Sequence, residues 1–225
     1  GGIAGQATDL AVEGVQVFAF RILAQDMYCG GLVGYSTGKL SVNNSGVAHS
    51  SSANYQENIV GSGTASSVGG LVGYSNADDF TIVESDVQSP VTGKDKVGGF
   101  VGELQGSLKI SGSFNSSSSQ LKGESRVGGF VGYSAVGSLT IRDSEQRCAV
   151  VATRGHVGGV VGECAQISVD TLYLNGSVSG GDKYAGGIVG LGRNVYLVNI
   201  EFGNGVTVNG PADVGGIAGR LENSK

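Results

Sequence analysis

The chain has 225 residues, of which 42 are glycine and 2 are proline, and charged residues make up only 15%. Collagen would need glycine at every third position with far more proline, and a disordered chain would hold fewer hydrophobic residues than the 40% found here. A formal net charge of -5 offers no basic surface to nucleic acid, and no apolar run is long enough to span a membrane. We therefore expect a folded chain that neither binds nucleic acid nor inserts into a membrane.

One phrase, GG[ILFV][VA]G, occurs eight times. Its copies begin at residues 1, 30, 69, 98, 128, 158, 186 and 215, so the unit is about 29 residues long. One interval, between the second and third copies, is about ten residues longer than the others. We place this insertion at about 50–67, within SSSANYQENIVGSGTASS, and expect a surface excursion there.

Each unit contains three segments with the composition of short strands. The first surrounds the phrase itself, as in VGGLVG, and the second alternates apolar and polar residues, as in KLSV, FTIV, SLKI and SLTI. A third, weaker segment reads GVA, DVQ, GSVS or GVTV, and the joints between segments are rich in Asn, Ser, Gly and Asp. This pattern predicts three short strands and three corners per unit.

Units of this size bury too little surface alone, so they must stack with each strand pairing to its equivalent in the next unit. The sequence therefore predicts an all-β fold, a parallel β-solenoid of 29-residue coils, coiled right-handed by default. Seven to eight coils at about 4.8 Å each would form a rod of roughly 35 Å.

The phrase glycines are the predicted structural corners. We expect them to adopt a left-handed backbone at a tight bend and to let neighbouring coils approach closely, so that any side chain would clash. The predicted corner glycines are Gly30, Gly31, Gly34, Gly69, Gly70, Gly73, Gly98, Gly99, Gly102, Gly128, Gly129, Gly132, Gly158, Gly159, Gly162, Gly186, Gly187 and Gly190.

The recurring GG[ILFV][VA]G phrase resembles the GLUG-motif repeats of large secreted and cell-surface proteins, and the resemblance covers essentially the whole chain. Such repeats occur in adhesin-like chains and beside the catalytic domain of IgA-specific metallopeptidases. The resemblance implies an extracellular, stalk-like or adhesive role without catalysis by the repeats. The insertion and the cysteines depart from the plain pattern.

Candidate catalytic residues are few. GYSTG at residues 34–38 matches a nucleophile elbow as a string, but GYS recurs at residues 73 and 132 without the second glycine. His49 and His156 lie in different units and have no partner histidine, so we expect solvated loop residues and no metal site. We expect no catalytic residue, cofactor or metal.

Two carboxylate pairs fall at shared offsets two units apart, Glu84 with Asp143 and Asp86 with Glu145. Their expected separation of roughly 10 Å is close to that of an inverting glycosidase pair. Ser113 and Asn115 should lie between them, which also fits acids spaced to avoid repulsion. A carbohydrate-active solenoid therefore stays open as an alternative.

Aromatic residues recur at two offsets. Tyr35, Tyr74 and Tyr133 lie five residues after the first glycine of their units, where an outward file could stack on sugar rings. Tyrosines that stack on one another and shield strand edges are the favoured alternative. Phe100 and Phe130 are expected to stack in the core.

The three cysteines are an odd number, so at least one is unpaired within this segment. Cys29 occupies a valine position and should pack as a small hydrophobe, while Cys148 and Cys164 could bridge successive units. Asn43, Asn115 and Asn175 sit in N-x-S sequons and are candidate glycosylation sites in a glycosylating host.

The chain opens on the phrase and closes eleven residues into a unit, so we expect a piece of a longer repeat array or end-to-end assembly of copies. The favoured function is a non-catalytic structural or adhesive shaft at the cell surface, with adjoining repeats, further copies, surface glycans or host proteins as partners. The alternatives are a repeat region that positions a secreted peptidase and, third, a carbohydrate-active β-helix.

Overall fold

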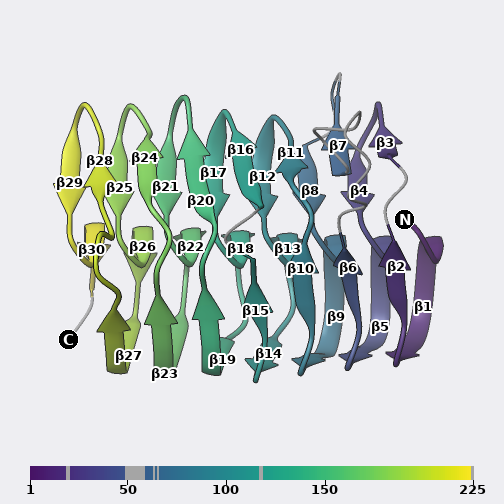
Figure 1. Cartoon of the computed structure of the whole chain (residues 1–225). Helices are drawn as coiled ribbons and strands as arrows, with labels where there is room; N and C mark the ends of the chain where they lie inside the picture. The colour runs from purple at the N-terminus through teal and green to yellow at the C-terminus, as the bar shows by residue number, and fades with distance from the viewer. Residues whose placement is uncertain (19–20, 49–58, 63, 65, 117–118, 224–225) are drawn as a thin grey trace.

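The computed structural model describes residues 1–225 except 19–20, 49–58, 63, 65, 117–118 and 224–225. The described chain forms a stack of similar coils, with the N-terminal coil at one end and the C-terminal coil at the other (Figure 1). Every strand pairing is parallel and joins neighbouring coils. The fold is therefore all-β, a parallel β-solenoid with three sheets running along it.

The largest sheet has 16 strands and carries two bends in each coil. Its strands are β1 (Ala4–Glu13), β2 (Gln16–Phe18), β5 (Val33–Asn43), β6 (Gly46–Ala48), β9 (Val72–Val83), β10 (Asp86–Gln88), β13 (Val101–Leu104), β14 (Leu108–Ser111), β15 (Phe114–Asn115), β18 (Val131–Ser134), β19 (Leu139–Gln146), β22 (Val161–Cys164), β23 (Ile167–Leu174), β26 (Val189–Arg193), β27 (Val195–Phe202) and β30 (Ala218–Glu222).

The other two sheets have seven strands each. One contains β3 (Ile22–Ala24), β7 (Ile59–Gly61), β11 (Val91–Thr92), β16 (Gln120–Gly123), β20 (Ala149–Ala152), β24 (Val178–Gly180) and β28 (Val208–Asn209). The last contains β4 (Tyr28–Gly30), β8 (Ser67–Gly69), β12 (Asp95–Gly98), β17 (Ser125–Gly128), β21 (His156–Gly158), β25 (Tyr184–Gly186) and β29 (Asp213–Gly215). The GG phrase joins each strand of this last sheet to the next strand of the largest sheet.

Residues at the same position of successive sequence repeats pair with one another in the stack. Val33 pairs with Val72, Val72 with Val101, and Val101 with Val131, so equivalent positions of successive phrases lie directly opposite one another. The longer second unit keeps this register.

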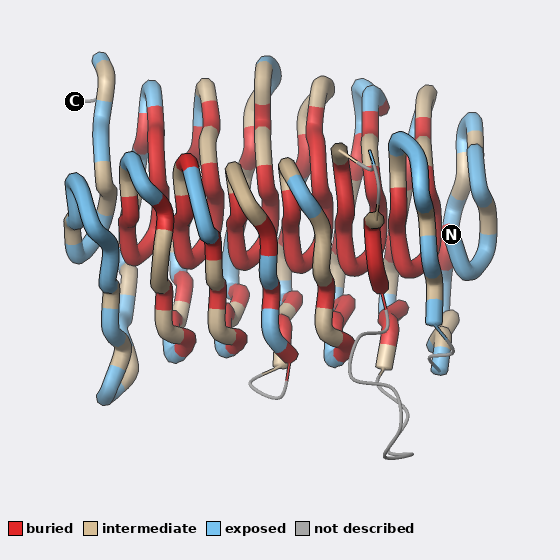
Figure 2. The backbone as a smooth tube through the Cα atoms, turned by 90° about the horizontal axis from the view of Figure 1, so that it is seen from above, coloured by how far each residue is buried: buried red, intermediate tan, exposed pale blue. Residues whose placement is uncertain are grey.

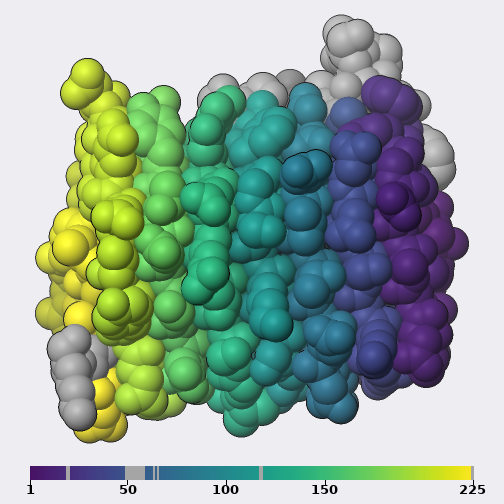
Figure 3. All heavy atoms as spheres, turned by 90° about the horizontal axis from the view of Figure 1, so that it is seen from below, coloured from purple at the N-terminus to yellow at the C-terminus, as the bar shows by residue number. Residues whose placement is uncertain are grey.

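The interior is a set of ladders of equivalent positions from successive coils, most of them apolar, although Asn115 and Gln146 continue the ladder of Val47 and Val87. Phe100 and Phe130 stack with ring centroids 4.7 Å apart and are fully buried, which confirms their prediction as core residues. Figure 2 shows buried residues running through the middle coils, with exposed residues gathered on the first and last coils. In the space-filling view the coils lie side by side as successive bands of a continuous body (Figure 3).

The predicted insertion at 50–67 is wrong at its C-terminal end. Residues 59–61 form β7, whose Ile59 is fully buried, and Ser67 begins β8. The apolar pair Ile59–Val60 fills the same ladder positions as Ile22 and Leu23 in β3, so it belongs to the coil. The start of the insertion, residues 50–58, and His49 lie outside the described residues.

Two details of the predicted strands are also wrong. The phrase is a corner between two sheets, because β4 ends at Gly30 and β5 begins at Val33. In the third segment, GVA and DVQ lie in the largest sheet, whereas Val178 of GSVS and Val208 of GVTV lie in β24 and β28 of another sheet. In those later coils β23 and β27 continue through the bend and fill the GVA position themselves.

Each glycine of the phrase is required by a different close approach. A Cβ on Gly128, the first glycine, would overlap the carbonyl oxygen of Val131 in its own turn. A Cβ on Gly129, the second, would overlap the carbonyl oxygen of Gly159 in the next coil. A Cβ on Gly73, the third, would lie 2.6 Å from the carbonyl oxygen of Gly34 in the preceding coil. The same three contacts recur along the stack.

The expectation of a left-handed backbone at the phrase glycines is wrong, because none of them has a positive φ. Space alone excludes a side chain there. The left-handed positions fall at other bends and are mostly occupied by non-glycine residues, which tolerate them as single residues in turns. One row of them comprises Asn44, Glu84, Gly112, Asp143, Thr171 and Asn199.

If space alone excludes a side chain, glycine-to-alanine substitution should destabilise the fold at a crowded phrase position and have no effect at an equivalent open one. We expect Gly129→Ala to lower the free energy of unfolding by about 3 kcal/mol, because the added methyl meets backbone that cannot move without shifting a coil. Gly216 is the copy of this glycine in the last phrase and has nothing within 4 Å of an added Cβ. Gly216→Ala should leave stability unchanged, as measured by urea unfolding, and equal losses at the two positions would contradict the account.

Candidate functional site

Two outward rows of side chains face each other across the glycine corner, and we call them together the corner zipper. The first row lies two residues before the phrase and the second lies five residues after its first glycine. The first row contains Tyr28, Ser67, Lys96, Arg126, His156, Tyr184 and Asp213. The second contains Gln6, Tyr35, Tyr74, Glu103, Tyr133, Glu163, Leu191 and Arg220.

The N-terminal part of the zipper is aromatic. Tyr35 and Tyr74 stack with ring centroids 5.1 Å apart, and Tyr28 packs on both rings at 5.4 and 4.7 Å. Burial and the nearby carboxylate of Glu103 raise the pKa of Tyr74 above its ordinary value. These rings use their faces on one another, as the favoured alternative for the tyrosine file predicted.

Tyr133 is separated from the other tyrosines of its row. Glu103 lies between Tyr74 and Tyr133 in the register, so the three predicted tyrosines do not form one continuous aromatic file. The ring of Tyr133 is instead covered by Lys96 and Arg126, whose charged groups lie 5.7 and 4.9 Å from its centroid. A cation over an aromatic face is attracted by the ring quadrupole.

Glu103 is the most enclosed charge of the zipper. Its carboxylate accepts hydrogen bonds from Lys96 Nζ at 2.8 Å, Ser67 Oγ at 2.7 Å and Gln105 Nε2 at 2.8 Å. Burial opposes its charge, but these hydrogen bonds win and hold the pKa of Glu103 below its ordinary value. Glu103 therefore ties three neighbouring coils together.

His156 is part of the corner zipper, so the prediction that it is a solvated loop residue is wrong. It lies in β21, its Nδ1 is 3.2 Å from Glu163 Oε2, and its ring stacks on Tyr184 at 5.0 Å. The hydrogen bond with His156 keeps the pKa of Glu163 below its ordinary value. The first row of the zipper was missed in the sequence, although aromatic and charged residues recur there two positions before each phrase.

The acids of the two predicted carboxylate pairs do lie at shared positions of the coil, but they do not converge on one point. Asp86 and Glu145 both pair with Phe114, which lies between them in the register. Asp86 also accepts hydrogen bonds from Gln16 at 3.2 Å and Gln88 at 2.7 Å, so both of its oxygens are engaged.

The other pair occupies a left-handed bend. Glu84 and Asp143 are exposed there, with Gly112 in the intervening coil. The residues predicted to lie between the acids, Ser113 and Asn115, are wrong by one position, because the chain from β13 to β14 is one residue shorter than its equivalents in the two neighbouring coils. This arrangement separates the acids along the stack.

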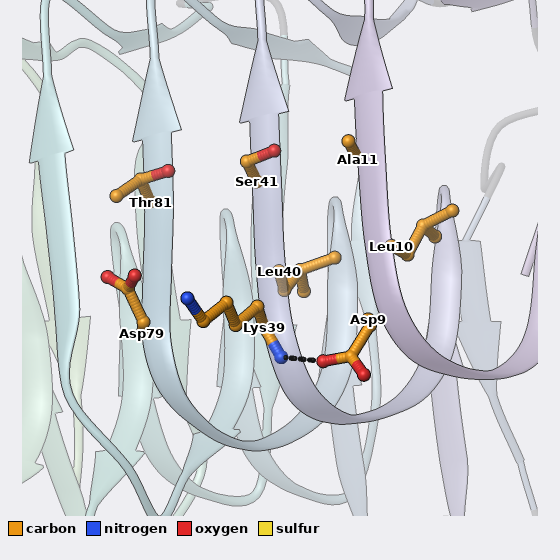
Figure 4. Close-up of a pocket in the computed structure, with 8 residues that line it drawn as sticks. All are labelled: Asp9, Leu10, Ala11, Lys39, Leu40, Ser41, Asp79 and Thr81. Atoms are coloured by element: carbon orange, nitrogen blue, oxygen red, sulfur yellow. Dashed lines mark hydrogen bonds between the residues drawn. The ribbon is translucent and has the colours of Figure 1, made fainter.

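One shallow cleft carries charged residues near the N-terminal end. It has a volume of about 340 Å³ and is lined by Asp9, Leu10, Ala11, Lys39, Leu40, Ser41, Asp79 and Thr81. These residues come from three successive coils (Figure 4). Asp9 Oδ1 accepts a hydrogen bond from the backbone N–H of Lys39 at 2.7 Å, so this carboxylate caps the bend of the next coil.

The string GYSTG has no nucleophile elbow around it. Ser36 lies inside β5, is 1% exposed, and its hydroxyl donates to Ser75 Oγ at 3.0 Å in the next coil. Nucleophile elbows need a strand-to-helix turn that exposes the hydroxyl. Across the part of the chain that the structure describes, no group of three potential metal-ligating side chains occurs and no helix could cross a membrane.

The sequons differ in their surroundings. Asn175 is exposed and Asn43 is half-buried, at the ends of β23 and β5. Asn115 is fully buried: its Nδ2 donates to the carbonyl of Gly129 at 2.7 Å, and its Oδ1 accepts from the backbone N–H of Arg147 at 2.8 Å. The folded chain therefore offers no free amide to a sugar at Asn115, and that candidate site is wrong.

A buried row of serines, missed in the sequence, follows the left-handed bend. Ser85 Oγ donates to the carbonyl of Val83 at 2.8 Å and accepts from the backbone N–H of Ser45 at 3.3 Å in the preceding coil. Equivalent bonds recur along the row Ser45, Ser85, Ser113 and Ser144. The signal was a serine directly after four of the bend residues, as in NS, ES, GS and DS at residues 44, 84, 112 and 143.

The three cysteines are buried free thiols, so Cys148 and Cys164 are not bridged. Cys29 is 1% exposed and packs in the core, in agreement with its prediction as a small hydrophobe. Burial raises the pKa of Cys148 and of Cys164 to about 12. Their thiolate forms are therefore suppressed at neutral pH.

We predict that Glu103→Gln destabilises the fold in a pH-dependent way. Because the folded pKa is depressed, the charged carboxylate stabilises the fold above its unfolded pKa, and this contribution is lost as pH falls through the folded value. Unfolding at about pH 7 should cost about 2 kcal/mol less in the variant, and the difference should shrink as pH falls through the lowered folded pKa of Glu103. Glu145→Gln, in the exposed pair with Arg147, is the control and should change little.

The burial of the thiols predicts their reactivity. In the native protein Cys29, Cys148 and Cys164 should not react with a thiol reagent at neutral pH, and all three should react at once after denaturation. Counting labelled thiols by mass spectrometry checks this result. Two protected thiols after denaturation without reductant would instead show a disulfide.

Comparison of the chain with protein-family models, with curated proteins and with solved structures finds no match. The resemblance to GLUG-motif repeats therefore rests on the residues of the phrase, and membership of that family stays a proposal.

Proposed function

We propose that this chain is a structural or adhesive shaft of an extracellular or cell-surface protein and has no catalytic role of its own. The observation that carries the proposal is the continuous pairing of the stack, in which equivalent residues of neighbouring coils pair from β4 to β29 and from β1 to β30, with local register shifts at Thr8/Leu10 and Gly38/Lys39. A stack paired in this way is stiff, so the distance between its two ends stays fixed. A spacer needs a fixed end-to-end distance.

The charged groups support the same proposal. Both oxygens of the enclosed carboxylate of Glu103 accept hydrogen bonds from neighbouring side chains, and so do both oxygens of Asp86. These hydrogen bonds hold the two carboxylates against neighbouring side chains of the stack. Catalytic acids instead need an open side and a partner within reach of one reacting atom.

The resemblance to GLUG-motif repeats supports the cell-surface location. It also keeps a second version of the proposal, in which the shaft positions a secreted peptidase. Both versions need the same mechanical property. They differ in what the rest of the parent protein carries.

We predict that the ends of the chain keep a fixed separation. Ala11 and Tyr196 are exposed and belong to one ladder six coils apart. Spin labels on Ala11→Cys and Tyr196→Cys should give one narrow distance distribution near about 29 Å, six strand spacings. The buried native thiols stay unlabelled. A broad distribution would contradict a rigid shaft.

The cellular role is tested in the source organism. Antibodies against the folded segment should label intact cells. Replacing the segment by a flexible linker of equal length should abolish attachment while leaving secretion unchanged. Normal attachment with the linker would overturn the shaft function, and hydrolysis of glycans by the purified chain would overturn its non-catalytic character.

A further inference from the structure

Three phenol side chains of the corner zipper are in mutual contact. Tyr35 and Tyr74 hold equivalent positions of neighbouring coils and pair with one another where β5 lies beside β9 (Figure 1). Their rings stack with centroids 5.1 Å apart and planes only 9° apart, and Tyr28 packs across both. Among the described residues, these are the tyrosines whose rings contact another tyrosine.

The stacked pair lies within the array and is open to small molecules. Strand β5 pairs with β1 on its other side, and β9 pairs with β13 and β14 on its other side, so the contact does not depend on an end face. The side chains of Tyr35 and Tyr74 are both half-buried. A small oxidant in solution can therefore reach the two rings.

Two tyrosine rings held in contact can be joined by one-electron oxidation. Each phenol loses one electron and one proton, and the two phenoxyl radicals form a carbon–carbon bond between the ring positions ortho to their oxygens. The two displaced ring hydrogens then return to the oxygens, which restores both phenols. A peroxidase supplied with hydrogen peroxide takes up the two electrons and two protons, and the peroxide becomes two molecules of water.

The charges around the zipper favour this pair over Tyr133. The carboxylate of Glu103 interacts with Tyr74, and a nearby negative charge favours the removal of an electron. Tyr133 belongs to the same row, but Glu103 separates it from Tyr74 in the register. Lys96 and Arg126 also lie over its ring, and their positive charges oppose electron loss.

We propose that Tyr35 and Tyr74 are a site of oxidative crosslinking, at which a peroxide-dependent one-electron oxidant forms a dityrosine bond between neighbouring coils. The bond would tie together the two ends of the longest unit, which lies between the second and third phrases. A covalent link of this kind restricts the unfolded chain, as a disulfide does. The use of such a link outside the cell rests on the proposed function, whereas the reaction itself does not.

The test is oxidation of the purified, dilute chain by a peroxidase and limiting hydrogen peroxide. The monomer should gain the blue fluorescence of dityrosine and lose two hydrogen atoms in mass, and tandem mass spectrometry should place the bond between Tyr35 and Tyr74. Tyr35→Phe and Tyr74→Phe keep the stacked rings but lack one phenol, so each should abolish this bond. Tyr133→Phe is the matched control and should crosslink as the unmodified chain does.

The effect on the stack is measured by amide hydrogen exchange before and after oxidation. Exchange should slow in β5 and β9, which the bond joins, and should stay unchanged in β23 and β27. The inference is overturned by a monomer without the bond, by a bond that Tyr133→Phe removes, or by unchanged exchange in β5 and β9. The spin-label distance is measured on the unoxidised chain, so failure of the crosslink leaves the shaft proposal standing.

Discussion

The fold depends on backbone meeting backbone at the glycine corner. Carbonyl oxygens of the same turn, the next coil and the preceding coil lie so close to the phrase glycines that no Cβ fits, and these three contacts recur in the phrases between the two ends. Hydrogen bonds such as Gly70 N–H to the carbonyl of Gly98, at 3.1 Å, close the corner onto the next coil. Because glycine is the residue without a Cβ, the phrase marks in the sequence where the stack is closest.

Stacking at a fixed spacing also decides what the surface can do. Each outward side chain has as its nearest neighbours the equivalent residues one coil above and below, so polar groups meet in rows. The zipper shows the result, with Glu103 held by groups from adjoining coils and Tyr133 covered by Lys96 and Arg126. Rows of this kind bring like positions together and keep acids of alternate coils apart.

The sequence predicted the coil, its length and its phase because the phrase repeats without exception. It predicted the Phe100–Phe130 stack for the same reason. It missed contacts that depend on bends, because a bend adds or removes one residue and shifts every later offset. The acids of Asp86 and Glu145 therefore flank Phe114 and not Asn115, and the sequon at Asn115 turned out to be a buried amide.

The backbone geometry of the corner could not be inferred from composition. Glycine suggested a left-handed backbone, yet the phrase needs glycine for space, and Asn44, Glu84 and Asp143 take the left-handed positions. A repeated glycine indicates that a side chain is not tolerated, but it does not distinguish a left-handed backbone from a lack of space. The serine row was missed for a related reason, since serine is common in turns and its burial is visible only in three dimensions.

The unequal units have a consequence for how such a chain varies. Units of 28, 30 and 39 residues all pair with their neighbours through the same described strands of the coil. Whole coils are therefore interchangeable parts, and deletion or duplication of one would shorten or lengthen the molecule by a single rung. Recombination between repeats can therefore change the length of the solenoid without changing its cross-section.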